Sequence, residues 1–152
     1  MKIDRFQLRE AFIKAIGPKK LYKFSSNKLT TNIPHFFVCI TTTQNEIVVF
    51  TCCTSQLEKR QSYIERYNLP YSTLVWIKAP NNLNELYKDT YVDCNKNFNY
   101  SYNDLRALYD NGTITYEGDI EEAEWLQIIQ GLLDSPRIDE LVKDGIRPLL
   151  HL

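Results

Sequence analysis

The sequence predicts an α+β fold: a small, strongly curved antiparallel sheet or partly open barrel, with one helix before it and several after it. Apolar residues recur at helical spacing near the N-terminus, short β-branched and aromatic runs fill the centre, and helical spacing returns in the last third. With 152 residues, 43% of them hydrophobic, the chain suits a single domain over 1–152. Within it we expect an N-terminal helix over 1–17, a barrel core over 33–95 and a mainly helical part over 100–152.

The first elements are a helix and a basic connection. Residues 4–16 place their apolar side chains near a 3.6-residue period, and Gly17-Pro18 ends the predicted helix. Residues 18–34 are rich in Lys, Ser, Thr and Asn without a sustained period. We interpret them as a basic loop with one short strand around Leu21–Phe24.

The centre of the chain begins with a predicted hairpin. Residues 35–41 and 46–52 are almost continuously apolar, aromatic or β-branched, and the residues between them are turn-like. Continuous apolar runs of this kind predict strands that are covered on both faces. The other elements expected in the centre and just after it are a short exposed helix over 57–67 and strands over 73–77, 90–94 and 113–116.

Three helices are predicted in the last third of the chain. Ser101 is a suitable N-cap for the first, which ends at the Asn-Gly pair 111–112. The Gly-Asp pair 118–119 opens the second, whose first turns are acidic, and the Ser-Pro pair 135–136 caps and starts the last. The side chains expected to face the core are Leu105, Leu108, Ile120, Ala123, Leu126, Ile129, Leu133, Ile138, Leu141 and Val142.

Charge is distributed unevenly along the chain. Residues 1–80 carry 12 Lys/Arg against 5 Asp/Glu, and residues 81–152 carry 6 against 14, although the net charge is only −1. The basic half can meet phosphates while the acidic half repels nucleic acid or covers the basic half; equally, both can be ordinary solvated faces. The chain shows no basic-then-apolar leader, no membrane-length apolar run and only four scattered cysteines, so we expect a cytoplasmic protein without a membrane anchor.

Two adjacent thiols stand in the stretch FTCCTSQLEKR at 50–60. Cys52 and Cys53 point to opposite faces of a strand, so they cannot both bind one metal. Cys39 and His35 share a face of the partner strand, but no C-x-x-C or H-x-x-x-H spacing accompanies them. We therefore interpret the thiols as small buried apolar side chains, and we do not expect a metal site here.

Two hydroxyls follow the thiols, at the point where the apolar run stops. Thr54 and Ser55 lie at a predicted strand end, with Lys59 and Arg60 nearby, and such a group can bind and orient a phosphate. The alternative is an ordinary cap, in which one hydroxyl accepts from the free amides of the following helix. Residue types alone leave both readings open and favour the cap.

Several segments resemble one family. VVFTCCTSQ at 48–56 is similar to the strand followed by T-S-Q in the PemK/MazF-like toxins, the ribonuclease components of type II toxin–antitoxin systems. His35–Ile40 resembles the H-F-V-V-V strand of a divergent branch of that family, and Asp89–Cys94 resembles its D-S-Y-V-D segment. The tail over 112–139 resembles the helical C-terminus of that branch. The resemblance spans about residues 33–140 and implies a small SH3-like barrel with appended helices.

The resemblance also implies an activity: cleavage of single-stranded RNA by attack of a ribose 2′-hydroxyl on the adjacent phosphodiester, with no metal or cofactor. In this family the catalytic groups are an Arg near the first long strand and the Thr/Ser of the T-S motif, which corresponds here to Thr54 and Ser55. Residues 10–57 contain no Arg, and His35 occupies the neighbouring position. His35 is therefore the candidate acid or base, because imidazole exchanges protons near neutral pH; a purely structural histidine is the alternative.

The expected binding partners differ between two hypotheses about function. A toxin-like ribonuclease would bind single-stranded RNA and an antitoxin protein, and would form a homodimer. The second hypothesis is a non-catalytic, protein-binding barrel, which the missing Arg and the acidic second half favour. Its contact surface would include the aromatic residues Tyr63, Tyr67, Tyr71 and Trp76. The alternative is that these rings are buried in the core or scattered singly over the surface. The RNA contacts expected under the first hypothesis are Lys28, Gln56, Lys59 and Arg60.

Overall fold

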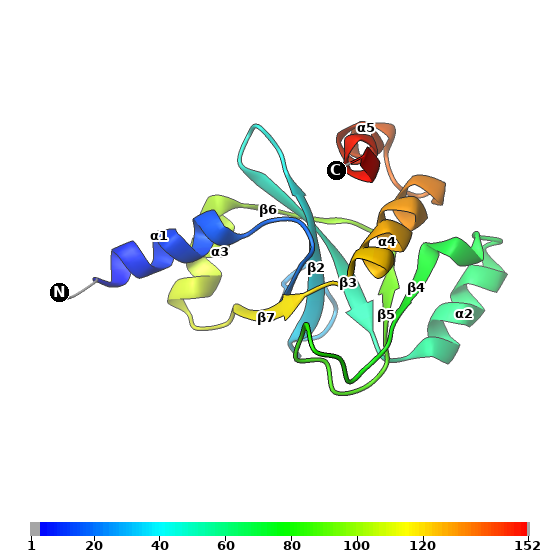
Figure 1. Ribbon diagram of the computed structural model, residues 1–152, viewed down its shortest axis with the longest axis horizontal. Coiled ribbons are helices and arrows are strands. Elements are labelled where there is room, and N and C mark those ends of the chain that lie inside the picture. Colours follow the sequence, from blue (N-terminus) through cyan, green and yellow to red (C-terminus); the bar gives the residue numbers. More distant parts are fainter. Residues whose placement is uncertain (1–3, 152) are drawn as a thin grey trace.

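One curled antiparallel sheet forms the centre of the protein, with helices packed around it (Figure 1). The computed structural model describes residues 4–151. The predicted α+β class with a strongly curved antiparallel sheet is confirmed. The strands are β1 (Lys20–Phe24), β2 (His35–Thr42), β3 (Ile47–Thr54), β4 (Leu74–Ile77), β5 (Thr90–Asp93), β6 (Phe98–Ser101) and β7 (Thr115–Asp119). The helices are α1 (Arg5–Ala15), α2 (Leu57–Arg66), α3 (Tyr102–Asp110), α4 (Glu122–Asp134) and α5 (Glu140–Ile146), with 3₁₀ turns η1 (Tyr71–Thr73) and η2 (Arg147–His151).

The longest pairing in the sheet is that of β3 with β2, and β3 also holds two shorter strands on its other edge. It pairs with β6 along its first half and with β5 at its end, where Thr54 lies opposite Tyr91. The strand order is β4-β5-β3-β2-β1-β7, with β6 beside β3. β5 and β6 therefore diverge at residues 94–97, which connect them. This divergence creates a corner in the sheet.

The segment between β4 and β5 covers the free edge of β7. Asp119 N donates to Leu83 O at 2.8 Å, and Glu85 N donates to Glu117 O at 2.9 Å. Gly118 permits this close approach, because its φ is +114° and a Cβ there would lie 2.3 Å from Leu83 O. The sheet therefore curls toward a barrel instead of leaving β7 as an open edge.

Each face of the sheet has its own core, because side chains alternate along β2 and β3. On one face Val38 and Ile40 pack with Trp125 and Ile128 of α4. On the other face lies an aromatic cluster that includes Phe37, Phe24, Phe50, Phe98 and Tyr100. The prediction that the hairpin strands are covered on both faces is confirmed.

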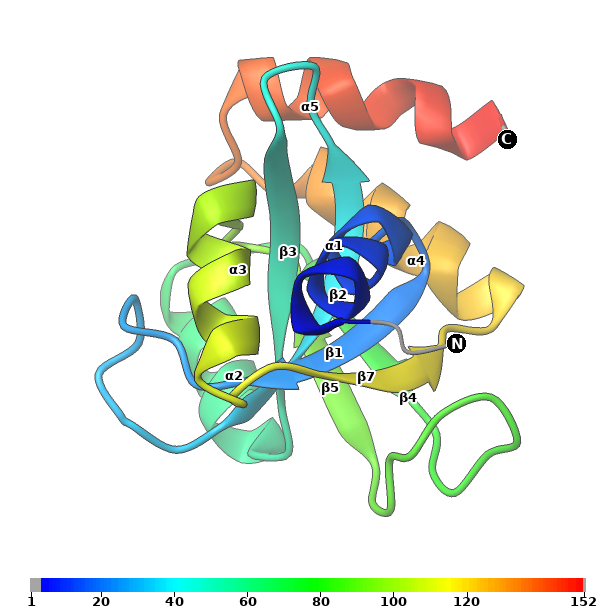
Figure 2. The same ribbon diagram turned by 90° about the vertical axis from the view of Figure 1, so that its left-hand side faces the viewer.

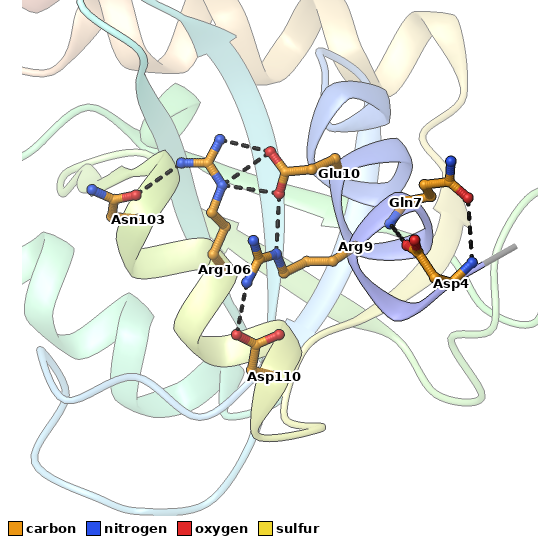
Figure 3. A network of polar contacts seen from close by, with 7 residues as sticks. All are labelled: Asp4, Gln7, Arg9, Glu10, Asn103, Arg106 and Asp110. Carbon is orange, nitrogen blue, oxygen red and sulfur yellow. Dashed lines mark hydrogen bonds and ion pairs between the residues drawn. The ribbon is translucent and has the colours of Figure 1, made fainter.

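The N-terminal helix α1 packs against α3 at one end of the molecule, away from α2, α4 and α5 (Figures 1 and 2). Arg106 of α3 donates to Glu10 of α1 at 2.8 Å, and Arg9 binds both Glu10 and Asp110 at 3.0 Å (Figure 3). α3 begins with a capping box at Ser101, which confirms the predicted N-cap. No helix within residues 4–151 combines the length and the apolar character needed to cross a membrane.

The helix predicted over 4–16, the central hairpin and the strand around Leu21–Phe24 are all present. The sequence does not predict β6, because this segment has only four residues and every second one is polar. It forms a strand through its pairing with β3. The sheet is therefore larger than the barrel core expected over 33–95, because β1, β6 and β7 also belong to it.

Two expected helix starts in the last third are wrong. Gly118 and Asp119 end β7, and α4 begins three residues later, at Glu122. Ser135 is the C-cap of α4, and its hydroxyl donates to Asn95, so it does not start α5, which begins at Glu140. In both places a long-range contact determines the conformation of a residue that looks like a local helix signal.

Some expected core positions are also wrong. Ala123 and Leu126 of α4 face solvent, because the buried side of this helix is formed by Trp125, Ile128, Ile129 and Leu132. Leu141 is 86% exposed, whereas Ile138 is buried as expected. Of the positions expected to face the core from this helix, Ile129 is buried and Leu133 is partly buried.

Candidate functional site

The candidate catalytic residues lie at the open end of the β2–β3 hairpin. The last paired residues at this end are Phe37 and Cys52, and His35 and Thr54 each lie two residues beyond them. Because side chains alternate along a strand, His35 and Thr54 occupy the same face as Phe37 and Cys52, opposite the face covered by α4. The hairpin therefore brings the start of β2 and the end of β3 to one edge, as the sequence predicts.

His35 is half-buried, and its ring is held by a backbone contact. Nδ1 lies 2.8 Å from the carbonyl oxygen of Ile33. A carbonyl only accepts, so Nδ1 carries the hydrogen, and in the neutral imidazole Nε2 carries the free lone pair. This tautomer leaves Nε2 able to take a proton from a bound group.

The hydroxyls of Thr54 and Ser55 differ in their surroundings. Thr54 is half-buried, and its Oγ1 accepts from the backbone N–H of Gln56 at 3.1 Å, which leaves the hydroxyl hydrogen free to donate. Ser55 is exposed and makes no side-chain hydrogen bond within residues 4–151. Gln56 is the N-cap of α2, and no side chain in this range caps the helix. The cap reading is therefore wrong for α2, whose first-turn amides have no side-chain acceptor.

The predicted RNA-binding residues are only partly brought together. Gln56 and Lys59 are exposed at the start of α2, close to Ser55 in the chain. Arg60 pairs with Asp93 of β5 at 3.2 Å. Lys28 lies apart from these residues, on the connection between β1 and β2, and its Nζ is 5.2 Å from the ring centre of Tyr100.

A basic cleft lies beside α2 at the corner where β5 and β6 diverge. It has a volume of about 610 Å³ and is lined by Arg60, Tyr63, Asp93, Asn95, Lys96 and Arg137. Of the predicted contacts only Arg60 belongs to it. Lys96 and Arg137 give no signal in the sequence, since they stand far apart in the chain. The connection after β5 and the connection between α4 and α5 bring them together.

The basic cleft borders the candidate catalytic edge through Cys52. Burial, and after it the carboxylate of Asp93, raise the pKa of the Cys52 thiol to about 12, although Arg60 and Lys96 act in the opposite direction. The sheet register brings Asp93 of the cleft beside Cys52, because Cys53 lies opposite Val92. A neutral thiol is a poor nucleophile, so Cys52 is not a candidate for nucleophilic catalysis.

The other cysteines are buried free thiols. Burial raises the pKa of Cys39 to about 12, and it also raises the pKa values of Cys53 and Cys94. In the part of the chain between 4 and 151, no three His, Cys, Asp or Glu side chains gather as metal ligands would. The interpretation of these thiols as apolar core residues agrees with their burial.

An aromatic hollow lies on the other flank of α2. Its volume is about 430 Å³, and its lining residues are Leu57, Gln61, Tyr71, Leu74, Trp76 and Tyr91. Tyr71 and Trp76 are 68% and 46% exposed, and Tyr91 is paired with both Thr54 and Trp76 in the sheet. The candidate catalytic edge therefore lies between a basic cleft and an aromatic hollow.

No protein-family model matches the chain, and no curated protein matches it either.

Proposed function

We propose that this protein is a metal-independent endoribonuclease of the toxin type that cleaves single-stranded RNA at the open end of the β2–β3 hairpin. The observation that carries the proposal is that the hairpin brings His35 and Thr54 to one face at one sheet edge, with exposed Ser55 next in the chain. The His35 ring is held at Nδ1, which leaves Nε2 as the acceptor, and neither hydroxyl caps the next helix. Such an edge combines a proton acceptor with donors for a phosphate.

The proposed reaction uses these groups in distinct roles. His35 Nε2 takes the proton of a ribose 2′-hydroxyl, whose oxygen attacks the adjacent phosphorus. The hydroxyls of Thr54 and Ser55, together with the first amides of α2, bind the phosphate oxygens as negative charge develops on them. The bond to the 5′-oxygen breaks, that oxygen takes a proton from water, and the imidazolium of His35 returns its proton to the hydroxide that remains. The products are a 2′,3′-cyclic phosphate and a 5′-hydroxyl. Gln56, Lys59 and Arg60 contact the neighbouring backbone.

The test is cleavage of single-stranded RNA by the purified chain in EDTA, with the fragment ends identified by mass spectrometry. We expect cyclic phosphate ends, a loss of at least about 100-fold in rate for His35→Ala, and about 10-fold or more for Ser55→Ala. His151→Ala is the matched control, because His151 is exposed at the other end of the chain and should leave the rate unchanged. RNA that stays intact at micromolar protein, or a His35→Ala variant as active as wild type, would overturn the proposal.

The second candidate function is a protein-binding barrel, and the exposed rings of Tyr71 and Trp76 in the aromatic hollow favour it. An antitoxin or another protein partner would cover these rings. Growth arrest on expression separates the two candidates. A Thr54→Ala/Ser55→Ala variant should lose toxicity if the chain is a ribonuclease, and should behave as wild type if it acts only by binding protein.

A further inference from the structure

The basic cleft holds more positive charge than the protein itself neutralises. Three cations line it, Arg60, Lys96 and Arg137, against the single carboxylate of Asp93. Arg60 pairs with Asp93, whose second oxygen accepts from Asn95 N at 3.0 Å. Lys96 and Arg137 form no ion pair with any residue between 4 and 151. Two positive charges therefore face the same hollow without a carboxylate partner.

The framework that presents these cations is held in place by stacking and by buried hydrogen bonds. The guanidinium of Arg137 lies 4.7 Å from the ring centre of Tyr67 and 5.3 Å from that of Tyr63, and Arg60 lies 5.4 Å from Tyr63. Such cation–ring contacts restrict the guanidinium groups without neutralising them.

Beneath the cations, a buried polar network fixes the two connections that carry them. Asn95 is 5% exposed; its Nδ2 donates to Thr73 Oγ1 at 2.9 Å, and its Oδ1 accepts from Ser135 Oγ at 2.7 Å. Ser135 Oγ also accepts from the backbone N–H of Arg137 at 3.1 Å. Lys96 follows Asn95 directly, so one network positions both unpartnered cations before any ligand arrives.

We propose that the basic cleft binds the 5′-phosphomonoester of a nucleotide, either free or at the 5′ end of an RNA strand. A phosphomonoester carries a charge of about −2 at neutral pH, which two unpartnered cations match, whereas each phosphodiester of a backbone carries one charge. The three cations converge on one hollow instead of following a groove, which fits a terminal group. A volume of about 610 Å³ also admits the sugar that carries the phosphate.

A nucleotide fits the surroundings of the cleft better than a phosphorylated peptide does. The aromatic hollow across α2 presents Tyr71, Trp76 and Tyr91, and rings of this kind stack on bases. The inference goes beyond the proposed cleavage and does not require it, because binding at Lys96 and Arg137 is separate from the chemistry at His35.

The experiment measures binding of two uncleavable RNA hexamers to the full chain by fluorescence anisotropy. Both hexamers carry 2′-O-methyl sugars and a 3′ dye; one has a 5′-phosphate and the other a 5′-hydroxyl. We expect the 5′-phosphate to tighten binding by about 10-fold, and Lys96→Ala/Arg137→Ala to abolish that difference. Arg5→Ala/Lys88→Ala is the matched control, since it removes the same two charges at exposed positions outside the cleft. Lys96→Arg/Arg137→Lys should keep a preference for the phosphate.

The outcomes separate the sources of the phosphate. Displacement of the hexamer by a nucleoside 5′-monophosphate supports the proposal and assigns a free nucleotide. No displacement, with the 5′-phosphate preference intact, supports it and assigns an RNA end. Equal affinity for the two hexamers, or an unchanged preference in Lys96→Ala/Arg137→Ala, would overturn it. So would displacement by a phosphoserine peptide as effective as that by the nucleotide.

Discussion

Two groups of cationic side chains at opposite ends of the molecule differ in their partners. At the α1–α3 end, Arg9 and Arg106 are bound by Glu10 and Asp110, so their charge is matched within the protein (Figure 3). At the α2 end, Arg137 and Lys96 face a hollow without a carboxylate partner in residues 4–151. We interpret the paired cations as part of the fold's stability, and the unpaired ones as the ligand-binding charges proposed above.

Stability at the α2 end should reside in uncharged groups beneath the cleft. Asn95→Ala leaves the hydroxyls of Ser135 and Thr73 without their buried partner, so we expect a loss of about 1–3 kcal/mol in the free energy of unfolding. Urea denaturation measures this loss. Asn97→Ala is the control on the same connection, since its amide bonds only the side chain of exposed Asn99, and its effect should stay within about 0.5 kcal/mol. Equal effects of the two variants would contradict this view of the cleft floor.

At the α1–α3 end, stability should depend on charge and therefore on pH. The guanidinium of Arg106, and then that of Arg9, hold the pKa of Glu10 below its ordinary value of 4.5. A carboxylate with a lowered pKa in the folded state stabilises the protein fully above its ordinary pKa, and the stabilisation is lost as the pH falls through the lowered value.

Wild type should therefore be more stable than Glu10→Gln at pH 7, and the gap should shrink only below about pH 4.5. Thermal unfolding between pH 7 and pH 3 measures it. Glu85→Gln, at an exposed position without a side-chain hydrogen bond in the described chain, should show no such gap. A gap that is constant across this range would mean that Glu10 acts through packing and not through its charge.

The smallest effect on stability is expected for Lys96, one of the two cations without a carboxylate partner in residues 4–151. Lys96→Ala removes a cation whose main contact is the ring of Phe98 at 5.0 Å, so the free energy of unfolding should change by no more than about 1 kcal/mol. Arg106→Ala should destabilise the fold more, because it removes the ion pair with Glu10 and leaves only that of Arg9 with Asp110 to join α1 and α3 within residues 4–151. A larger loss of stability for Lys96→Ala than for Arg106→Ala in urea denaturation would show that the unpartnered cation stabilises the fold.

The sequence predicts the hairpin and its neighbours because their apolar runs determine strand and burial together, as in His35–Thr42 and Ile47–Thr54. It also predicts that His35 and Thr54 lie at one sheet edge, since an antiparallel hairpin must bring the start of one strand to the end of the next. Both inferences need only residues that are close in the chain.

The residues that the sequence does not reveal depend on distant contacts. Ser135 looks like a local helix cap, but it is bound by Asn95 from the connection after β5. Gly118 looks like a helix start, but it accommodates the backbone of Leu83. Lys96 and Arg137 become a pair only when these contacts form. A single sequence contains no local pattern for a site of this kind.

Hydrogen–deuterium exchange with an uncleavable, 5′-phosphorylated RNA hexamer tests most directly whether the α2 end of the molecule binds RNA. We expect slower exchange in the amides around Ser55 and the first turn of α2, and in the connection at 94–97, with no change in α1 or α3. Protection centred on α1 and α3, or no protection anywhere at saturating RNA, would contradict this assignment of the two charged regions.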